Sequence, residues 1–142
     1  MQFPDGTTGT GVVAADGSYG PITSLVPQTS GSTSISLTDI AGNISTPVTL
    51  PFVDSVAPLT PAAPVVVQNL NETVSVSGNA GAAEAGSTLH ITFPDGSQTT
   101  AVVASDGSYG PVLSATTQIS GTVTIQAFDA AGNQSPPAST VF

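Results

Sequence analysis

The sequence repeats itself once, at an offset of 90 residues. Residues 3–6 read Phe-Pro-Asp-Gly and return as residues 93–96, where 93 − 3 = 90. The same offset relates residues 16–21, Asp-Gly-Ser-Tyr-Gly-Pro, to residues 106–111, with no insertion between the two motifs. A period of about 90 residues is too long for a solenoid repeat and matches one independent β-sandwich domain. The repeat therefore predicts a string of separate β domains.

The two copies differ in extent. Residues 54–142 form one whole period, whereas residues 1–53 match only its later part and lack everything equivalent to the residues up to Thr92. We expect residues 1–53 to be the C-terminal part of a preceding repeat and residues 54–142 to be a complete repeat. We also expect Met1 to be an added start residue at a cut inside a longer protein.

Residues 54–142 contain seven short segments that read as strands, separated by Gly, Asn and Asp turn signals. Strict alternation places Leu89, Ile91 and Phe93 on one face of a strand. Seven short strands in a unit of this length are typical of a two-sheet Greek-key sandwich, so we predict an all-β chain of tandem immunoglobulin-like repeats, one complete and one truncated. The predicted strands are 63–68, 73–78, 89–93, 99–103, 108–114, 122–128 and a last one ending near Phe142. The predicted core is Val74, Val76, Leu89, Ile91, Phe93, Val123 and Ile125.

The charge balance is one-sided. The chain has no Lys or Arg and nine Asp and Glu, which gives a formal net charge of −9. Nucleic acids and anionic membrane surfaces both attract Lys and Arg, so this composition argues against either as a partner. Because no cationic side chain can pair with them, the carboxylates must stay hydrated, accept hydrogen bonds or bind a metal ion. We therefore expect calcium as a possible ligand.

Residue types needed for catalysis or for covalent cross-links are scarce. There is no Cys, so the domain has neither disulfides nor a thiolate nucleophile, and His90 is the only histidine. His90 is predicted to face solvent on its strand, with no second His or Cys to complete a zinc site. No apolar run reaches the length of a membrane span, and any export signal is expected outside this sequence. We predict that the protein is not an enzyme.

Four motifs together carry a family resemblance. They are the connector at residues 54–58, the stretch at residues 86–96, the Asp-Gly-Ser-Tyr turn at residues 106–109 and Asp-x-Ala-Gly-Asn-x-Ser at residues 129–135. In this combination the sequence resembles the bacterial Ig-like repeats of giant, type I-secreted, biofilm-associated adhesins. The resemblance implies an extracellular stalk of many repeats on the bacterial cell surface, stiffened in several relatives by calcium at domain junctions.

The loop order of an Ig-like sandwich sorts the acidic residues. Glu84, Asp106 and Asp129 fall in loops predicted at the end where the chain enters the complete repeat, beside the connector residue Asp54. Asp5 would reach the same junction from the preceding repeat. With Asn133, these residues are the candidate calcium ligands. The alternative is turn chemistry, because Asx side chains bond their own backbone, and we expect Asp54 and Asp129 to need it least.

Three functions remain open from the sequence. The first is a structural or adhesive spacer repeat, stiffened by calcium, in a surface adhesin involved in biofilm formation and cell adhesion. The second is an Ig-like module that binds a ligand directly. The third is self-association, including contact between cells, through the strands that a truncated repeat would expose. The loops favour the spacer because they are short and nearly free of aromatic and Arg anchors, and we expect Tyr19 and Tyr109 to pack at the sandwich edge. Neighbouring repeats of the same protein are then the expected partners.

Overall fold

The computed structural model describes residues 1–142 and divides them into unit 1, Met1–Ser55, and unit 2, Val56–Phe142. Both units consist of strands and turns, with no helix in either. No segment therefore forms a helix that is long and apolar enough to span a bilayer. The all-β prediction is confirmed.

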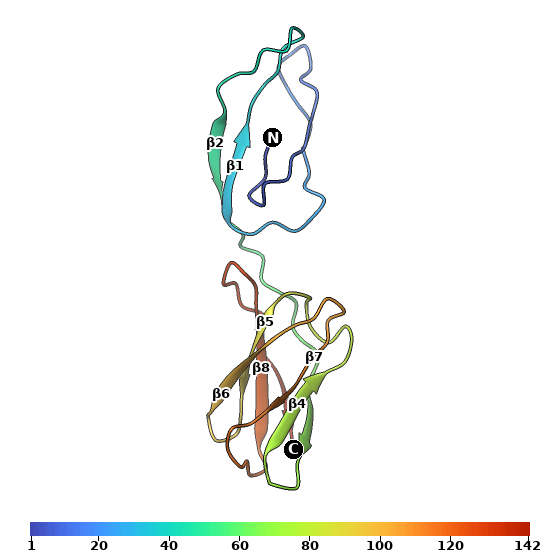
Figure 1. Ribbon diagram of the computed structural model, residues 1–142, viewed down its shortest axis with the longest axis vertical. Coiled ribbons are helices and arrows are strands. Elements are labelled where there is room, and N and C mark those ends of the chain that lie inside the picture. The colour runs from blue at the N-terminus through green and yellow to red at the C-terminus, as the bar shows by residue number, and fades with distance from the viewer. The chain divides into compact units, whose positions relative to one another are not determined.

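Unit 2 is a sandwich of two antiparallel sheets (Figure 1). Strands that are distant in sequence lie side by side, as when β4 pairs with β7 and β5 pairs with β8. This pairing of strands that are not consecutive in the chain is the Greek-key arrangement that the strand count predicted. The three-stranded sheet contains, in order, β3 (Val65–Gln68), β4 (Val74–Gly78) and β7 (Tyr109–Leu113). The four-stranded sheet contains β6 (Gln98–Val102), β5 (Thr88–Thr92), β8 (Thr122–Phe128) and β9 (Ala138–Val141).

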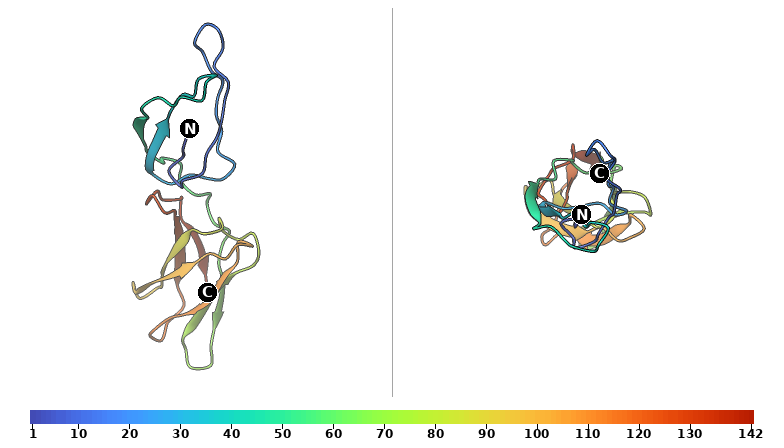
Figure 2. Two further views of the ribbon diagram at one scale, coloured as in Figure 1. Left: turned by 45° about the horizontal axis from the view of Figure 1, so that its top comes forward. Right: turned by 90° about the horizontal axis from the view of Figure 1, so that it is seen from above.

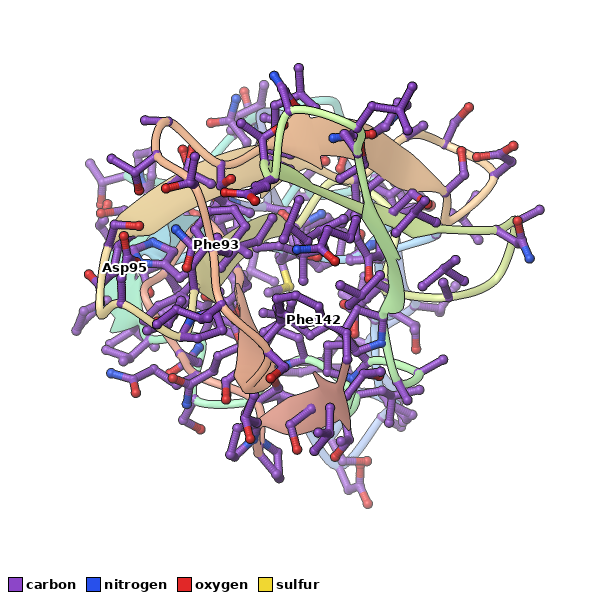
Figure 3. All side chains as sticks on the ribbon, turned by 90° about the horizontal axis from the view of Figure 1, so that it is seen from below. Phe93, Asp95 and Phe142 are labelled. Carbon is purple, nitrogen blue, oxygen red and sulfur yellow. The ribbon has the colours of Figure 1, made fainter.

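The core of unit 2 lies between the two sheets. Alternate residues of β4, β5 and β8 point inward, because successive side chains of a strand face opposite sides of its sheet. All seven core residues predicted from the sequence are buried, and Phe142 packs against them. Figure 3 shows Phe93 and Phe142 toward the middle of the unit and Asp95 at its margin.

Tyr109 lies in the core, which corrects the expectation that it packs at the sandwich edge. Its side chain is only 4% exposed, and its Cα partner on the neighbouring strand is Gly78. The tyrosine ring covers this glycine so closely that a Cβ at position 78 would overlap the ring. The Tyr109 hydroxyl has no hydrogen-bond partner, and burial raises the pKa of Tyr109 to about 12.

The chain of unit 2 enters and leaves at opposite ends of the sandwich. Near its start, the Leu59 amide donates a hydrogen bond of 3.1 Å to the Glu84 carboxylate in the loop between β4 and β5. At the other end, Phe142 and Gly121 exchange two backbone hydrogen bonds, and Gly121 lies beside Pro94 in the turn between β5 and β6. Because these two connections lie at opposite ends of β5, so do the first and last residues of the unit (Figure 1).

Unit 1 has one pair of strands, β1 (Gly31–Ile35) and β2 (Val48–Phe52). Their register matches that of β8 and β9 at the 90-residue offset, since Ser32 pairs with Pro51 as Thr122 pairs with Val141. The remaining pairings are isolated bridges, and most of residues 1–30 form coil on the side of the unit away from β2 (Figures 1 and 2).

The bridges of unit 1 also have equivalents in unit 2. Gln2 bridges to Thr8 and to Ser34, and at the same offset Thr92 pairs with Gln98 and with Thr124. Unit 1 thus retains the same order of strands around this point as the four-stranded sheet of unit 2. However, Phe3 is its only buried large apolar side chain, and many others are exposed.

Candidate functional site

Four Asp-Gly turns share one hydrogen-bond pattern. At Asp106, Oδ1 accepts hydrogen bonds from the Ser108 amide at 2.9 Å and from the Ser108 hydroxyl at 2.6 Å. Equivalent bonds to the residue two positions later are made by Asp5, Asp16 and Asp95. These bonds favour the ionised carboxylate, so they hold the pKa of each of these Asp residues below its ordinary value. Turn chemistry accounts for one oxygen of each side chain.

Asp95 makes a further bond that ties its turn to a neighbouring loop. Its Oδ2 accepts a hydrogen bond of 2.7 Å from the Thr116 hydroxyl, while its backbone amide donates to Oε1 of Gln118. Gln118 is buried, and its backbone amide donates a hydrogen bond to the Glu72 backbone carbonyl. Gln118 is not among the residues singled out from the sequence. Its signal was present, because Gln28 stands at the equivalent position of unit 1 and accepts from the Asp5 amide.

Asp129 and Asn133 form a closed loop after β8. Oδ1 of Asp129 accepts hydrogen bonds from the Ala131 and Asn133 amides, both at 2.9 Å, and its Oδ2 accepts from Nδ2 of Asn133 at 2.8 Å. The Asn133 side chain is the main cause that lowers the pKa of Asp129. These bonds contradict the expectation that Asp129 is among the residues with the least part in turn chemistry. The same loop occurs in unit 1, where Asp39 and Asn43 make the equivalent bonds.

Glu84 and Asp106 lie in loops that pack together at the end where the chain enters unit 2. The Gly81 amide donates to the Asp106 carbonyl at 2.8 Å, and the Ala83 amide donates to the Gly107 carbonyl at 3.1 Å. Both acidic side chains are exposed. The prediction that these two loops share one end of the sandwich is confirmed. The contact between them is made by the backbone, while the Glu84 carboxylate bonds to the Leu59 amide.

The remaining candidate ligands, Asp5 and Asp54, belong to unit 1. Asp5 is exposed in its turn, and the backbone amide of the half-buried Asp54 donates to the Ser30 hydroxyl at 3.0 Å. Nowhere in the structure do three or more acidic or histidine side chains gather in a way that could hold a metal ion. Since calcium takes six to eight oxygen ligands, neither unit by itself offers a complete set of side-chain ligands. Calcium binding by these residues stays a prediction.

His90 lies on the outer face of the four-stranded sheet, as predicted. Its side chain is exposed, and its ring stacks against that of Phe128 at a centroid distance of 4.3 Å and an interplanar angle of 34°. The neighbouring strand places Gln126 directly opposite. These surroundings of one aromatic ring and neutral side chains give the imidazole a packing role on the sheet surface.

Comparison with known proteins found a similar solved structure and a matching family model. The structure is that of a tetra-tandem repeat in the extending region of a large adhesion protein, which is 25% identical and superposes with a TM-score of 0.49. The match covers 93% of this chain and 37% of that one, so this chain spans little more than a third of its length. No curated protein matches. Residues 60–142, more than half of the chain, match the family model of the bacterial Ig domain. The chain therefore belongs to the bacterial Ig domain family.

Proposed function

We propose that this chain is a non-catalytic spacer segment of a bacterial surface adhesin, in which tandem Ig-like repeats hold an adhesive region away from the cell. The family supports this role, since a bacterial Ig domain is a structural kind of module. The repetition of the sequence at an offset of 90 residues agrees with it, because an array of such modules needs consecutive copies. An extracellular location, on the cell surface, is part of the same proposal.

One observation carries the proposal: the chain enters and leaves unit 2 at opposite ends of the sandwich. Glu84 binds the Leu59 amide at one end, and Phe142 pairs with Gly121 at the other. A domain with this geometry adds its full length to a molecule each time the domain is repeated. A domain whose termini lay together would add little.

The composition of the exposed loops favours a spacer over a module that binds a ligand through them. Binding hot spots are enriched in Trp, Tyr and Arg, and this chain has no Trp and no Arg. Of its two tyrosines, Tyr109 is buried. What the loops offer instead is short turns closed by Asp, Gly and Ser.

The test is scattering from concatenated copies of residues 54–142. If repeats extend the molecule, the radius of gyration should come close to doubling between two and four copies. A compact assembly would grow only about 1.3-fold, because a globular radius scales as N to the power of about 0.38. A ratio near the compact value would refute the spacer role, whatever the copies bind.

We further propose that calcium stiffens the array through some of Asp5, Asp54, Glu84, Asp106, Asp129 and Asn133. Charge supports this proposal, since nine acidic residues meet no Lys or Arg in the chain. In addition, the turn bonds of Asp106 involve a single carboxylate oxygen, Oδ1. Extracellular modules commonly bind calcium at about 0.1 to 1 mM, and a ligand at about 100 times Kd stabilises the folded state by about 2.7 kcal/mol.

The calcium proposal is tested with the 142-residue chain in EDTA, in millimolar calcium and in millimolar magnesium. Calcium should raise the melting temperature and narrow the distribution of maximum dimensions, and Asp54→Ala and Asp129→Ala should weaken both effects. Asp16→Ala, which removes an Asp-Gly turn carboxylate outside the candidate set, is the control. Identical behaviour in calcium, magnesium and EDTA would leave these residues as turn formers and solvated charges.

A further inference from the structure

Residues 58–64, which we call the entry segment, lead the chain into unit 2 and belong to neither of its sheets. Three prolines of this segment are buried, at positions 58, 61 and 64, whereas all the residues between them are exposed. Leu59 is 78% exposed, although it is the largest apolar residue of the segment. Burial here therefore follows a period of three residues and not the hydrophobicity of the side chains.

A period of three residues is that of the polyproline II helix, in which every third side chain lies along the same edge. The ring of proline fixes φ close to the value of this helix. A β-strand would bury alternate residues, and the segment forms neither strand nor α-helix. The three buried proline rings thus form one edge, along which the entry segment packs on unit 2.

The hydrogen bonds of the entry segment recur at the same spacing. The Leu59 amide donates to the Glu84 carboxylate at 3.1 Å, and three residues later the Ala62 amide donates to the Ala82 carbonyl at 2.7 Å. Both donors directly follow a buried proline, and both acceptors lie in the loop between β4 and β5. Because proline has no amide hydrogen, burying its ring leaves no backbone donor without a partner.

The far end of the entry segment is bonded to the four-stranded sheet. The Pro64 carbonyl accepts a hydrogen bond of 2.8 Å from the Thr140 hydroxyl of β9, and β3 begins at the next residue, Val65. The segment is therefore held along its whole length by two separate parts of unit 2, the loop between β4 and β5 and the last strand.

We infer that Pro58, Pro61, Pro64 and Glu84 are positioning residues, which hold the entry segment on unit 2 as a polyproline II helix that moves with this unit. Any bending of the chain between consecutive units is then confined to the residues ahead of Pro58. Glu84 acts through the Leu59 amide, without a metal ion. This inference rests on the proposed spacer function, in which a fixed direction of entry limits how far one repeat swings relative to the next.

The test is nitrogen-15 relaxation of the 142-residue chain in EDTA. The amides of residues 59, 60, 62 and 63 should have order parameters of about 0.85, as rigid backbone does, whereas a flexible linker gives values below about 0.6. Glu84→Ala should lower the value at Leu59 and leave that at Ala63 unchanged. Glu84→Gln should restore it, because the side-chain oxygen of Gln still accepts a hydrogen bond from the amide.

A second variant separates the spacing of the prolines from their number. Pro61→Ala combined with Ala62→Pro moves one ring by a single residue and leaves the composition unchanged. This change takes the ring off the buried edge and removes the amide that bonds to Ala82, so the order parameters at Thr60 and Ala63 should fall below about 0.6. Thr60→Ala, at an exposed position, is the control and should change neither neighbour. Unchanged amides in β5 and β8 would show that unit 2 stays folded.

Three results would overturn the inference. The first is an order parameter below about 0.6 across residues 59–63 of the original chain in EDTA. The second is full order in the variant with the shifted proline, since proline content alone would then stiffen the segment. The third is an unchanged Leu59 amide in Glu84→Ala. The spacer function is tested separately by the scattering of concatenated copies, so a rigid entry segment in a compact array would refute the spacer and not this inference.

Discussion

The substitution Ile125→Ala should strongly destabilise unit 2, whereas the same change at the equivalent position of unit 1 should not. Ile125 is completely buried between the sheets of unit 2, directly opposite Ile91 on the neighbouring strand. Replacing a buried Ile by Ala removes apolar contacts and leaves a cavity, at a cost of about 2 to 5 kcal/mol. For a domain of this size, a cost of about 3 kcal/mol corresponds to a fall in melting temperature of about 12 to 24 °C.

The matched control is Ile35→Ala, which makes the same change at the equivalent position of unit 1. Ile35 is half-buried beside an open cleft, so its truncation encloses no cavity. Because the substituted residue lies in the other unit, the free energy of unfolding of unit 2 should stay within about 0.5 kcal/mol of its original value.

Urea denaturation followed by tyrosine fluorescence measures both variants. The chain has two tyrosines and no tryptophan, so a Tyr19→Phe background leaves Tyr109 in the core of unit 2 as the reporter. Should Ile125→Ala unfold too far to measure, Ile125→Val is expected to cost about 0.5 to 1.5 kcal/mol. A loss under about 1 kcal/mol for Ile125→Ala, or equal losses for both alanine variants, would refute the burial described for β8.

Three further predictions use the same pairing of positions or the turn carboxylates. Ser135→Ala should lower the free energy of unfolding of unit 2 by about 1 to 3 kcal/mol, measured by urea denaturation, because the buried Ser135 hydroxyl accepts a hydrogen bond from the Ala127 amide at 2.9 Å. Ser45→Ala, at the exposed equivalent position of unit 1, should have little effect. Gly107→Ala should lower the melting temperature of unit 2 more than Gly17→Ala lowers that of unit 1: both have positive φ, but only at Gly107 would a Cβ lie 2.8 Å from the Ala83 carbonyl oxygen. Hydrogen bonds, first that from Ser97, lower the pKa of Asp95 in the folded state below its ordinary value of 3.8, so its contribution to stability is fully present above pH 3.8 and is lost as the pH falls from there through the lowered pKa. The difference in melting temperature between Asp95→Asn and the original chain should therefore shrink between about pH 4 and pH 2, and a constant difference would contradict this coupling.

The alternating pattern of the sequence was enough to predict most of the core of unit 2. Alternation in β4, β5 and β8 leaves little choice, because a shift of one residue would turn the whole apolar set of a strand to the solvent. The positions of turns were equally readable, since Asp-Gly pairs bond their own backbone whatever surrounds them. Local chemistry of this kind needs no partner from elsewhere in the chain.

Features that depend on a partner distant in sequence follow only from the tertiary structure. Tyr109 is buried because β7 lies beside β4 and places the ring over Gly78, and neither segment alone contains that information. The same ring at Tyr19 is exposed, although the motif around it is identical, because no equivalent of β4 covers it. Burial is a property of the pair of surfaces, so two copies of one sequence pattern can form a closed core in one unit and an open cleft in the other.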